Sequence, residues 1–175
     1  MDENQTSKTW IVQALFLLLR EKPLAKITVT EITKKAGVAR LTFYRNFDSK
    51  EAVIQYQSNA LFEQYLSELQ QQTDRSIDAI LRMSFAYWQQ GEETLQVMIQ
   101  NELTPMLEQA FRQYLTIIVD SFPEFNQFTH VQQYFLIGGI VQVIIDWLGH
   151  GAKPDANQVV DEILALINQQ NIYRD

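Results

Sequence analysis

The chain has 175 residues, of which 46% are hydrophobic, so it is long enough for one domain with a core or for a small head on a larger body. It contains no cysteine, which excludes disulfides and thiolate metal sites, and its two histidines, His130 and His150, do not suffice for zinc or Cys/His chemistry. We therefore expect no enzymatic activity, no cofactor and no metal. The N-terminus is unlike a secretory signal, and the richest apolar stretch, residues 134–145, is too short to cross a membrane, so the expected location is the cytoplasm.

The formal charge of −7 is distributed unevenly along the chain. Residues 1–51 hold nine Lys or Arg against six Asp or Glu, a balance of +3, whereas the remainder holds five against fifteen, a balance of −10. Such a division is typical of a basic head that binds DNA on an acidic body that turns its own surface away from it. The alternative is ordinary variation in surface charge.

The first predicted helix covers residues 6–20, where apolar residues recur at helical spacing, and Pro23 marks the loop after it. The second helix begins near Thr28, because Thr28 and Glu31 have the spacing of a capping box. It ends at Gly37, which can adopt the left-handed backbone of a tight turn. We expect the first helix to pack across the next two.

A third, short helix is predicted over residues 40–47. Phe43 and Phe47 lie four positions apart and anchor one face, which leaves polar and cationic side chains on the other. Two helices joined by a short turn, the second with such a face, are typical of a helix-turn-helix that inserts its second helix into the major groove. Asp48 is the predicted cap of the next helix. Lys50 lies in that helix's first turn, where the helix dipole opposes a cation, so a phosphate partner explains it better than helix stability does.

Several residues of this region stand at defined distances from one another and together form a motif. They are Thr28, Val29, Ile32 and the runs 36–38, 42–47 and 49–51. In these residues the chain resembles the N-terminal DNA-binding signature of the TetR/AcrR family of bacterial transcriptional regulators. The resemblance covers roughly a quarter of the chain. It implies an all-helical homodimer with a three-helix DNA-binding head, a ligand-binding and dimerising body, and a repressor role that a small molecule relieves.

The resemblance also implies roles for individual residues. Thr28 and Thr30 would approach the DNA backbone, Tyr44 and Lys50 would hold phosphates, and the residues in or beside the groove would be Arg40, Leu41, Thr42, Arg45 and Asn46. Three positions depart from the family pattern: Ala39 replaces the usual capping serine, Leu41 a frequent glycine and Asn46 a frequent histidine. Leu41 either touches a thymine methyl group or is simply an exposed leucine.

Helical spacing continues to the end of the chain. Further helices are predicted over residues 49–70, 73–90, 92–101, 104–122 and 128–148 and from 154 onward, so the fold class is all-α with about nine helices. We assign residues 1–51 to a DNA-binding domain with the helix-turn-helix, and residues 52–175 to a ligand-binding and dimerisation domain. The helix over 49–70 spans about 30 Å, so it can join head and body and transmit a tilt between them.

Bulky amphipathic side chains in the middle helices are candidates for an effector pocket. The predicted lining is Phe85, Trp88, Met98, Phe111, Tyr114 and Tyr134. The alternative is that these residues are simply the core. The acidic body favours a neutral or cationic small molecule as the effector.

The helix over 128–148 is apolar on nearly every face, so it must be buried on every side, and a second copy of the chain is the simplest partner. Gly138 and Gly139 in its middle fit a close crossing of two backbones. The predicted dimer interface is Val141, Ile144, Ile145, Leu148, Val160, Ile163, Leu164 and Ile167. The alternative is a core helix buried within one chain.

Together these features predict a DNA-binding transcriptional regulator, a ligand-responsive repressor that acts as a homodimer on a palindromic operator in double-stranded DNA. The first alternative is a coactivator of the same fold that binds no DNA and acts through protein contacts, although such a protein would need no cationic recognition face. A small-molecule hydrolase or binding protein with an incidental helical head is the remaining alternative.

Overall fold

The computed structural model describes residues 3–171, which form nine α-helices and two short 3-10 helices and contain no strand. The elements are α1 (Glu3–Leu19), η1 (Leu24–Lys26), α2 (Val29–Ala36), α3 (Arg40–Asn46), α4 (Lys50–Gln70), α5 (Ile77–Gln90), α6 (Glu92–Gln100), α7 (Thr104–Ser121), η2 (Pro123–Gln127), α8 (His130–Gly149) and α9 (Ala156–Asn171). The all-α prediction is therefore confirmed. The two 3-10 helices were not predicted.

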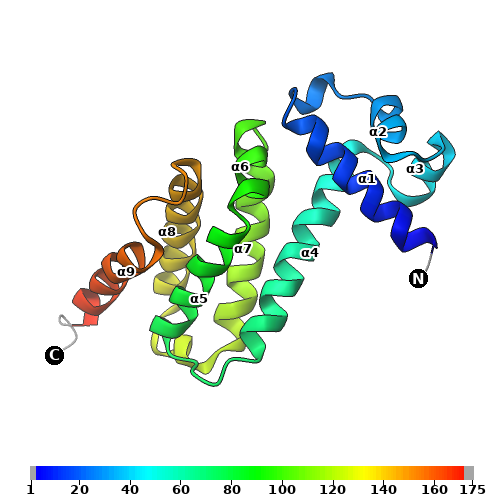
Figure 1. The fold of residues 1–175 in the computed structure, drawn as a ribbon. Coiled ribbons are helices and arrows are strands. Elements are labelled where there is room, and N and C mark those ends of the chain that lie inside the picture. The colour runs from blue at the N-terminus through cyan, green and yellow to red at the C-terminus, as the bar shows by residue number, and fades with distance from the viewer. Residues whose placement is uncertain (1–2, 172–175) are drawn as a thin grey trace.

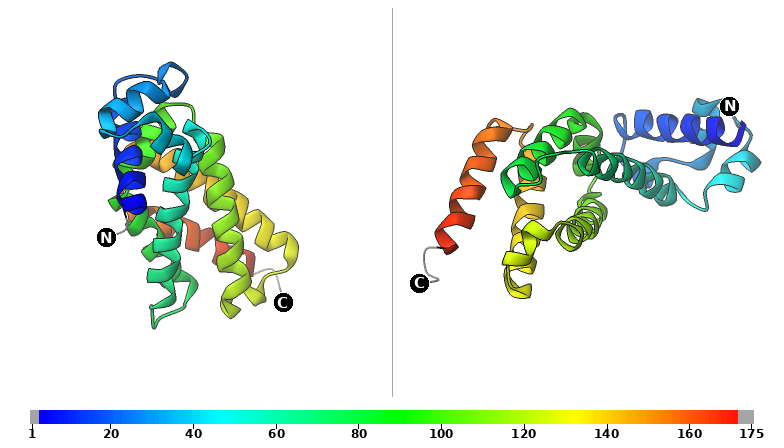
Figure 2. Two further views of the ribbon diagram at one scale, coloured as in Figure 1. Left: turned by 90° about the vertical axis from the view of Figure 1, so that its right-hand side faces the viewer. Right: turned by 90° about the horizontal axis from the view of Figure 1, so that it is seen from below.

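Helices α1 to α3 form a small head at one end of the molecule, and α5 to α9 form the body at the other (Figures 1 and 2). The α1 helix packs across α2 and α3, as its apolar spacing predicted. The head has its own core, in which Ile11, Leu15, Ile32 and Phe43 are completely shielded from solvent. This core fixes the relative orientation of the two helices of the motif.

The α4 helix runs from the head into the body without a break (Figure 1). Ser49, rather than the predicted Asp48, caps its N-terminus, because the Ser49 hydroxyl accepts a hydrogen bond from the Ala52 amide. The predicted domain boundary between residues 51 and 52 falls in the first turn of α4. Further along, Phe62 and Tyr65 of the same helix are buried in the body. The single helix α4 therefore contributes side chains to the cores of both the head and the body.

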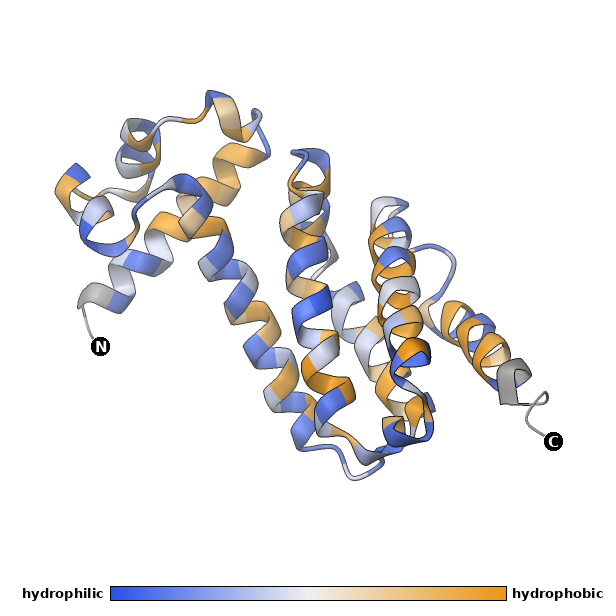
Figure 3. Ribbon diagram, turned by 180° about the vertical axis from the view of Figure 1, so that it is seen from behind, coloured by the Kyte–Doolittle hydropathy of each residue, from blue (hydrophilic) through white to orange (hydrophobic). Residues whose placement is uncertain are grey.

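In the body, α7 packs against α4 and α8, α6 against α8, and α5 against α9. Figure 3 shows that apolar residues extend along most of α8 and along one face of α9. By length and composition alone, α8 could cross a membrane, and it is the one such helix within residues 3–171. One helix of this kind is weak support for a membrane span, since core helices share the same composition. Seven of its side chains, Ile144 and Leu148 among them, are buried inside the protein.

Candidate nucleic-acid interface

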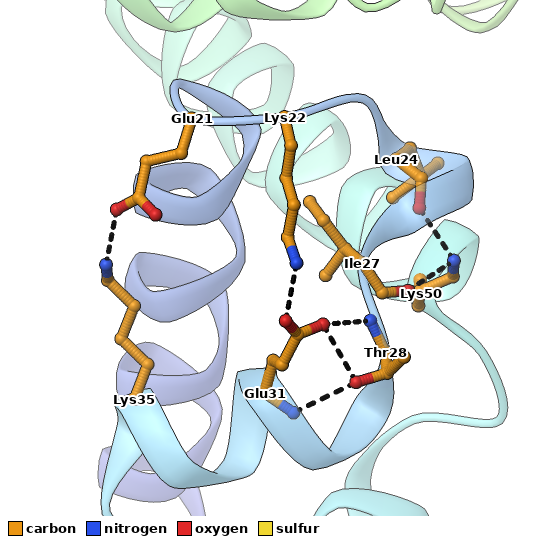
Figure 4. Close-up of polar contacts among 8 residues, drawn as sticks. All are labelled: Glu21, Lys22, Leu24, Ile27, Thr28, Glu31, Lys35 and Lys50. Carbon is orange, nitrogen blue, oxygen red and sulfur yellow. Dashed lines mark hydrogen bonds and ion pairs between the residues drawn. The ribbon is translucent and has the colours of Figure 1, made fainter.

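The N-terminus of α2 is held by the predicted capping box (Figure 4). The Thr28 hydroxyl accepts a hydrogen bond from the Glu31 amide at 3.2 Å, and the Glu31 carboxylate accepts from the Thr28 amide at 2.9 Å. Lys22 donates to the same carboxylate at 2.5 Å. The hydrogen bond from Lys22, together with those from Thr28, lowers the pKa of Glu31 to about 2. The carboxylate therefore stays ionised and ties the loop before α2 to the first turn of the helix.

The turn between α2 and α3 is built on Gly37, whose φ of 69° lies in the left-handed region. A residue with a Cβ would be strained there. Ala39, at the N-cap of α3, provides no side-chain cap, as expected for an alanine in this place. The first amides of α3 therefore receive no side-chain cap, so a phosphate or water can bind them, whereas the Thr42 amide already donates to the Ala39 carbonyl at 2.9 Å.

Helix α3 divides into a buried and an exposed face, as the sequence predicted. Phe43 and Phe47 are buried and pack on each other with ring centroids 6.1 Å apart. On the opposite face Leu41 is 61% exposed, Tyr44 is 47% exposed, and Arg40 and Arg45 are also exposed.

The two arginines of this face differ in their contacts. Arg40 donates a hydrogen bond to the Tyr44 hydroxyl at 3.4 Å, and its guanidinium lies 5.7 Å from the centre of the Tyr44 ring. The Arg45 side chain forms no hydrogen bond or ion pair with any group of residues 3–171. One arginine is therefore pre-oriented along the helix, and the other is free to move toward a ligand.

Two predicted contact residues lie partly out of reach of a ligand. Thr42 and Asn46 are half-buried at the edge of the exposed face. The Asn46 side-chain amide donates to the Thr42 carbonyl at 2.8 Å, and its Oδ1 atom is buried with no hydrogen-bond partner. Thr28 and Thr30, at the start of α2, are exposed, although the Thr28 hydroxyl is engaged in the capping box.

Lys50 has a different environment from the one inferred from its position. Its ammonium donates to the backbone carbonyls of Leu24 and Ile27, each at 2.7 Å (Figure 4). Two carbonyl dipoles therefore stabilise this cation in the first turn of α4, so its position there does not by itself require a phosphate. A phosphate contact through the third N–H of Lys50 stays a prediction.

Other head cations are also paired within the chain. Lys35 bonds to Glu21 at 2.8 Å, and Arg20 forms an ion pair with Glu93 of the body at 2.5 Å. The cations that the head offers to a ligand are therefore Arg40 and Arg45 of α3 together with Lys26 and Lys34, two exposed lysines with no side-chain partner within residues 3–171. A protein surface of this kind suits DNA, since guanidinium groups and hydroxyls bind phosphates and base edges.

Residues 11–56 match the family model for bacterial regulatory proteins of the tetR family. The N-terminal region is a TetR-family DNA-binding domain. This confirms the family assignment made from the sequence. Two curated relatives are similar to part of the chain: the nucleoid occlusion factor SlmA of Marinobacter nauticus, 40% identical over 68 residues, and the HTH-type transcriptional regulator EthR of Mycobacterium tuberculosis, 54% identical over 37 residues.

These alignments cover 37% and 21% of this chain, and the chain spans only 35% and 17% of the length of the two relatives. Solved structures match over nearly the whole chain. Lin0861 of Listeria innocua covers 97% of this chain and 94% of its own at 16% identity, with a TM-score of 0.73. The regulator FadR of Bacillus subtilis, solved in complex with stearoyl-CoA, covers 90% and 96% at 18% identity, with a TM-score of 0.58. At these identities the likeness shows that the fold is shared.

The predicted effector pocket is largely a packed aromatic core. Phe85, Trp88, Met98, Phe111 and Tyr114 are all buried. Phe62 of α4 fills the space between three of them, with its ring centre 4.5 Å from that of Tyr114, 4.6 Å from Trp88 and 4.9 Å from Phe111. These contacts favour the alternative that the five residues are core.

Tyr134 was wrongly grouped with these residues. It is 63% exposed on α8, where its ring meets that of His130. The spacing of apolar residues did not reveal this, because α8 carries apolar side chains on its outer as well as its inner face.

The residues predicted for the dimer interface point mostly into their own chain. Seven are buried within the single chain and Leu164 is half-buried. The predicted set therefore does not form a surface that is open to a second chain. The apolar side chains that do reach the surface are on the other face of α8 and on α9, where Phe135 is 67% and Leu166 65% exposed. An apolar groove runs between the two helices and is lined by Phe135, Leu136, Gly139, Ile140, Val143, Ile163, Leu166 and Ile167. Of the predicted residues, Ile163 and Ile167 belong to this groove.

Proposed function

We propose that the chain is a DNA-binding transcriptional regulator whose α3 helix reads the major groove. The observation that carries this proposal is the face of α3, on which Arg40, Leu41, Tyr44 and Arg45 are exposed while Phe43 anchors the helix from behind. A recognition helix needs one face bound to its support and the other open to base edges and phosphates.

The contacts of this face suggest separate roles. Arg45 has no partner in residues 3–171, so it can reach guanine O6 and N7 with both ends of its guanidinium. Arg40 lies at the N-terminus of α3, which usually approaches the bases most closely, and Tyr44 holds it in place. The Tyr44 hydroxyl can donate its own hydrogen to a phosphate. Leu41 can contact a thymine methyl group.

A homodimer is supported by the apolar groove between α8 and α9. Exposed apolar side chains line it, and a Cβ placed on Gly139 would meet nothing within 4 Å in the single chain. A second copy that packs α8 and α9 against this groove would cover Phe135 and Leu166 and could bring the two α8 backbones close at the glycines. Two heads related by a twofold axis would read a palindromic operator with half-sites about 34–36 Å apart.

Regulation by a small molecule is supported by the fold, since the structurally similar FadR of Bacillus subtilis was solved with stearoyl-CoA bound. For this chain we propose a neutral or cationic effector, because the body is acidic, and a repressor role that the effector relieves. Cytoplasmic location follows from action on chromosomal DNA.

The proposal is tested by a gel-shift titration on the DNA upstream of the chain's own gene, at several salt concentrations. Arg45→Ala and Tyr44→Ala should each weaken binding by about tenfold or more, because a good base or phosphate contact contributes about 1–3 kcal/mol. Arg112→Ala, on the exposed surface of α7, is the matched control and should leave binding unchanged. Full binding by both α3 variants would overturn the assignment of the reading helix. Absence of DNA binding by the unaltered protein would favour the coactivator alternative.

A further inference from the structure

A hollow of about 390 Å³ lies where the head meets the body, between α1, α4 and α6. Its lining comes from all three helices and consists of Thr9, Val12, Gln13, Phe16, Tyr56, Gln57, Ala60 and Thr94. We call it the junction cleft. Its volume lies within the range of about 300–1,000 Å³ that is usual for sites of small organic ligands.

The side chains that line the junction cleft carry no formal charge, although the cleft lies between a basic head and an acidic body. Val12 and Phe16 provide an apolar wall. Gln13, Gln57 and Thr94, one from each helix, provide amide and hydroxyl groups, and none of these three side chains has a hydrogen-bond partner within residues 3–171. The lining therefore suits a neutral molecule with an apolar part and several hydrogen-bonding groups. None of the lining side chains offers a positive charge to a carboxylate or phosphate, and the nearby Lys8 ammonium is engaged with the Tyr56 ring, 5.4 Å from its centre.

The junction cleft is also connected to the reading helix through two aromatic contacts. Tyr56 forms part of its lining, and the Tyr56 ring packs on Phe47 with centroids 5.5 Å apart. Phe47 in turn packs on Phe43, the anchor of α3. On its other side Tyr56 accepts a hydrogen bond from Gln5 of α1 at 3.0 Å. A molecule that displaces Tyr56 would therefore act on both α1 and α3.

The head is attached to the body at two places that the junction cleft separates. The first is α4 itself, and the second is the contact of the C-terminal end of α1 with both ends of α6. There Asn101 donates to the Leu19 carbonyl at 3.0 Å, and Arg20 pairs with Glu93. A molecule inserted between α1 and α4 would push the head away from α4 while this contact holds the end of α1. The result is a rotation of the head relative to the body, and in a dimer such a rotation changes the distance between the two α3 helices.

We propose that the junction cleft is an effector site for a small, neutral, amphipathic molecule, and that its occupation lowers the affinity for DNA. The effect on DNA rests on the proposed function, whereas binding of the molecule does not. The packed aromatic core of the body, where the sequence analysis placed the effector, is filled by its own rings.

The test uses the fact that the chain has no cysteine. Ala60→Cys places a single thiol in the cleft, and Ser67→Cys places one on an exposed part of the same helix outside it. Each protein is equilibrated with the disulfide of N-(2-mercaptoethyl)benzamide, a neutral probe that forms a mixed disulfide with the introduced cysteine. Increasing concentrations of 2-mercaptoethanol then compete for the cysteine and release the probe. We expect removal of the probe from position 60 to need at least about fivefold more reductant than from position 67, because contacts in the cleft add to the disulfide. A 4-carboxy derivative of the probe should lose this advantage. Equal retention at both positions would overturn the proposal.

The second measurement is DNA affinity. The probe at position 60 should weaken binding about tenfold, within the usual range of coupling between two sites, and the probe at position 67 should leave it unchanged. Thr94→Cys, on the α6 side of the cleft, should repeat the result and guards against a local defect of the Ala60→Cys protein. Selective retention without any change in DNA affinity would disprove the regulatory role. If the unlabelled proteins do not bind DNA at all, the proposed function fails, but the comparison of retention still decides whether the cleft binds the molecule.

Discussion

Replacement of Lys50 by methionine should destabilise the protein even though Lys50 is only partly buried. The substitution keeps the length of the side chain and its helix propensity but removes the ammonium that binds the Leu24 and Ile27 carbonyls at 2.7 Å. Hydrogen bonds to a charged group contribute about 1.5–3 kcal/mol when buried, and here water can replace part of that contribution. Removal of a cation from the first turn of α4 returns about 0.3–1 kcal/mol through the helix dipole.

The expected net loss is about 1–2 kcal/mol in the free energy of unfolding, which corresponds to a decrease of roughly 0.5–1 M in the urea midpoint. Urea unfolding followed by far-UV circular dichroism measures it. Lys26→Met is the control, because Lys26 is an exposed lysine of the same head for which the structure records no side-chain partner within residues 3–171. It should change the free energy of unfolding by less than about 0.5 kcal/mol. Equal midpoints for the two variants would refute a structural role for Lys50.

The same variant also decides whether Lys50 contacts DNA. A phosphate contact contributes about 0.9 to the slope of log K against log salt for duplex DNA, independently of the stability of the protein. A slope unchanged in Lys50→Met, measured below the unfolding transition, would assign the lysine to the head alone. A slope lower by about one unit would show that its third N–H reaches a phosphate.

Three further predictions follow from single residues. The hydrogen bond from Lys22 is the main cause of the lowered pKa of Glu31, which is about 2. The Glu31 carboxylate therefore contributes fully to stability above about pH 4.5, and this contribution is lost as the pH falls to 2. Thermal melts at pH 7, 4.5, 3 and 2 should show the loss, and Glu31→Gln should show a smaller one. Burial raises the pKa of Tyr65 to about 12, so the stability of the protein should fall as the pH rises from 10 to 12. Tyrosinate absorbance at 295 nm should rise with unfolding. The Tyr65→Phe protein should unfold at a higher pH than the unaltered protein does. Gly139→Leu should leave the single chain folded, since nothing lies within 4 Å of the new Cβ, but should weaken the dimer, and sedimentation equilibrium that shows an unchanged dimer would contradict a close crossing at this glycine.

The head could be predicted in detail because its signals are local. The capping box joins residues three positions apart, the Gly37 turn depends on one backbone angle, and the two faces of α3 follow from the spacing of Phe43 and Phe47. Each of these devices acts within a few residues, so the sequence alone contains all of its parts. Lys50 could not be read in this way, because its two carbonyl partners lie 26 and 23 residues earlier in the chain.

The body shows a second limit of sequence analysis, which concerns the phase of an apolar helix. On α8, Ile137, Val141, Ile144 and Leu148 are buried at intervals of three and four residues and form the stripe that packs on α6 and α7. Phe135 is equally apolar, yet it lies off this stripe and is exposed. Hydrophobicity alone ranks both sets as buried, and which of them turns inward depends on where α6 and α7 lie.

The outer stripe differs from the inner one in a way that the sequence does show. The buried stripe of α8 is made of branched aliphatic residues, whereas the open side includes Gly139 beside the large Phe135. A glycine in a helix lowers its stability by about 0.5–1 kcal/mol relative to alanine, so a glycine on an open face is unexplained by the fold of the single chain. Close packing inside the chain does not require this glycine, because a Cβ at Gly139 would meet no atom of residues 3–171 within 4 Å. An apolar groove with an exposed glycine at its edge therefore supports the proposed dimer, in which a second α8 helix packs closely against this groove.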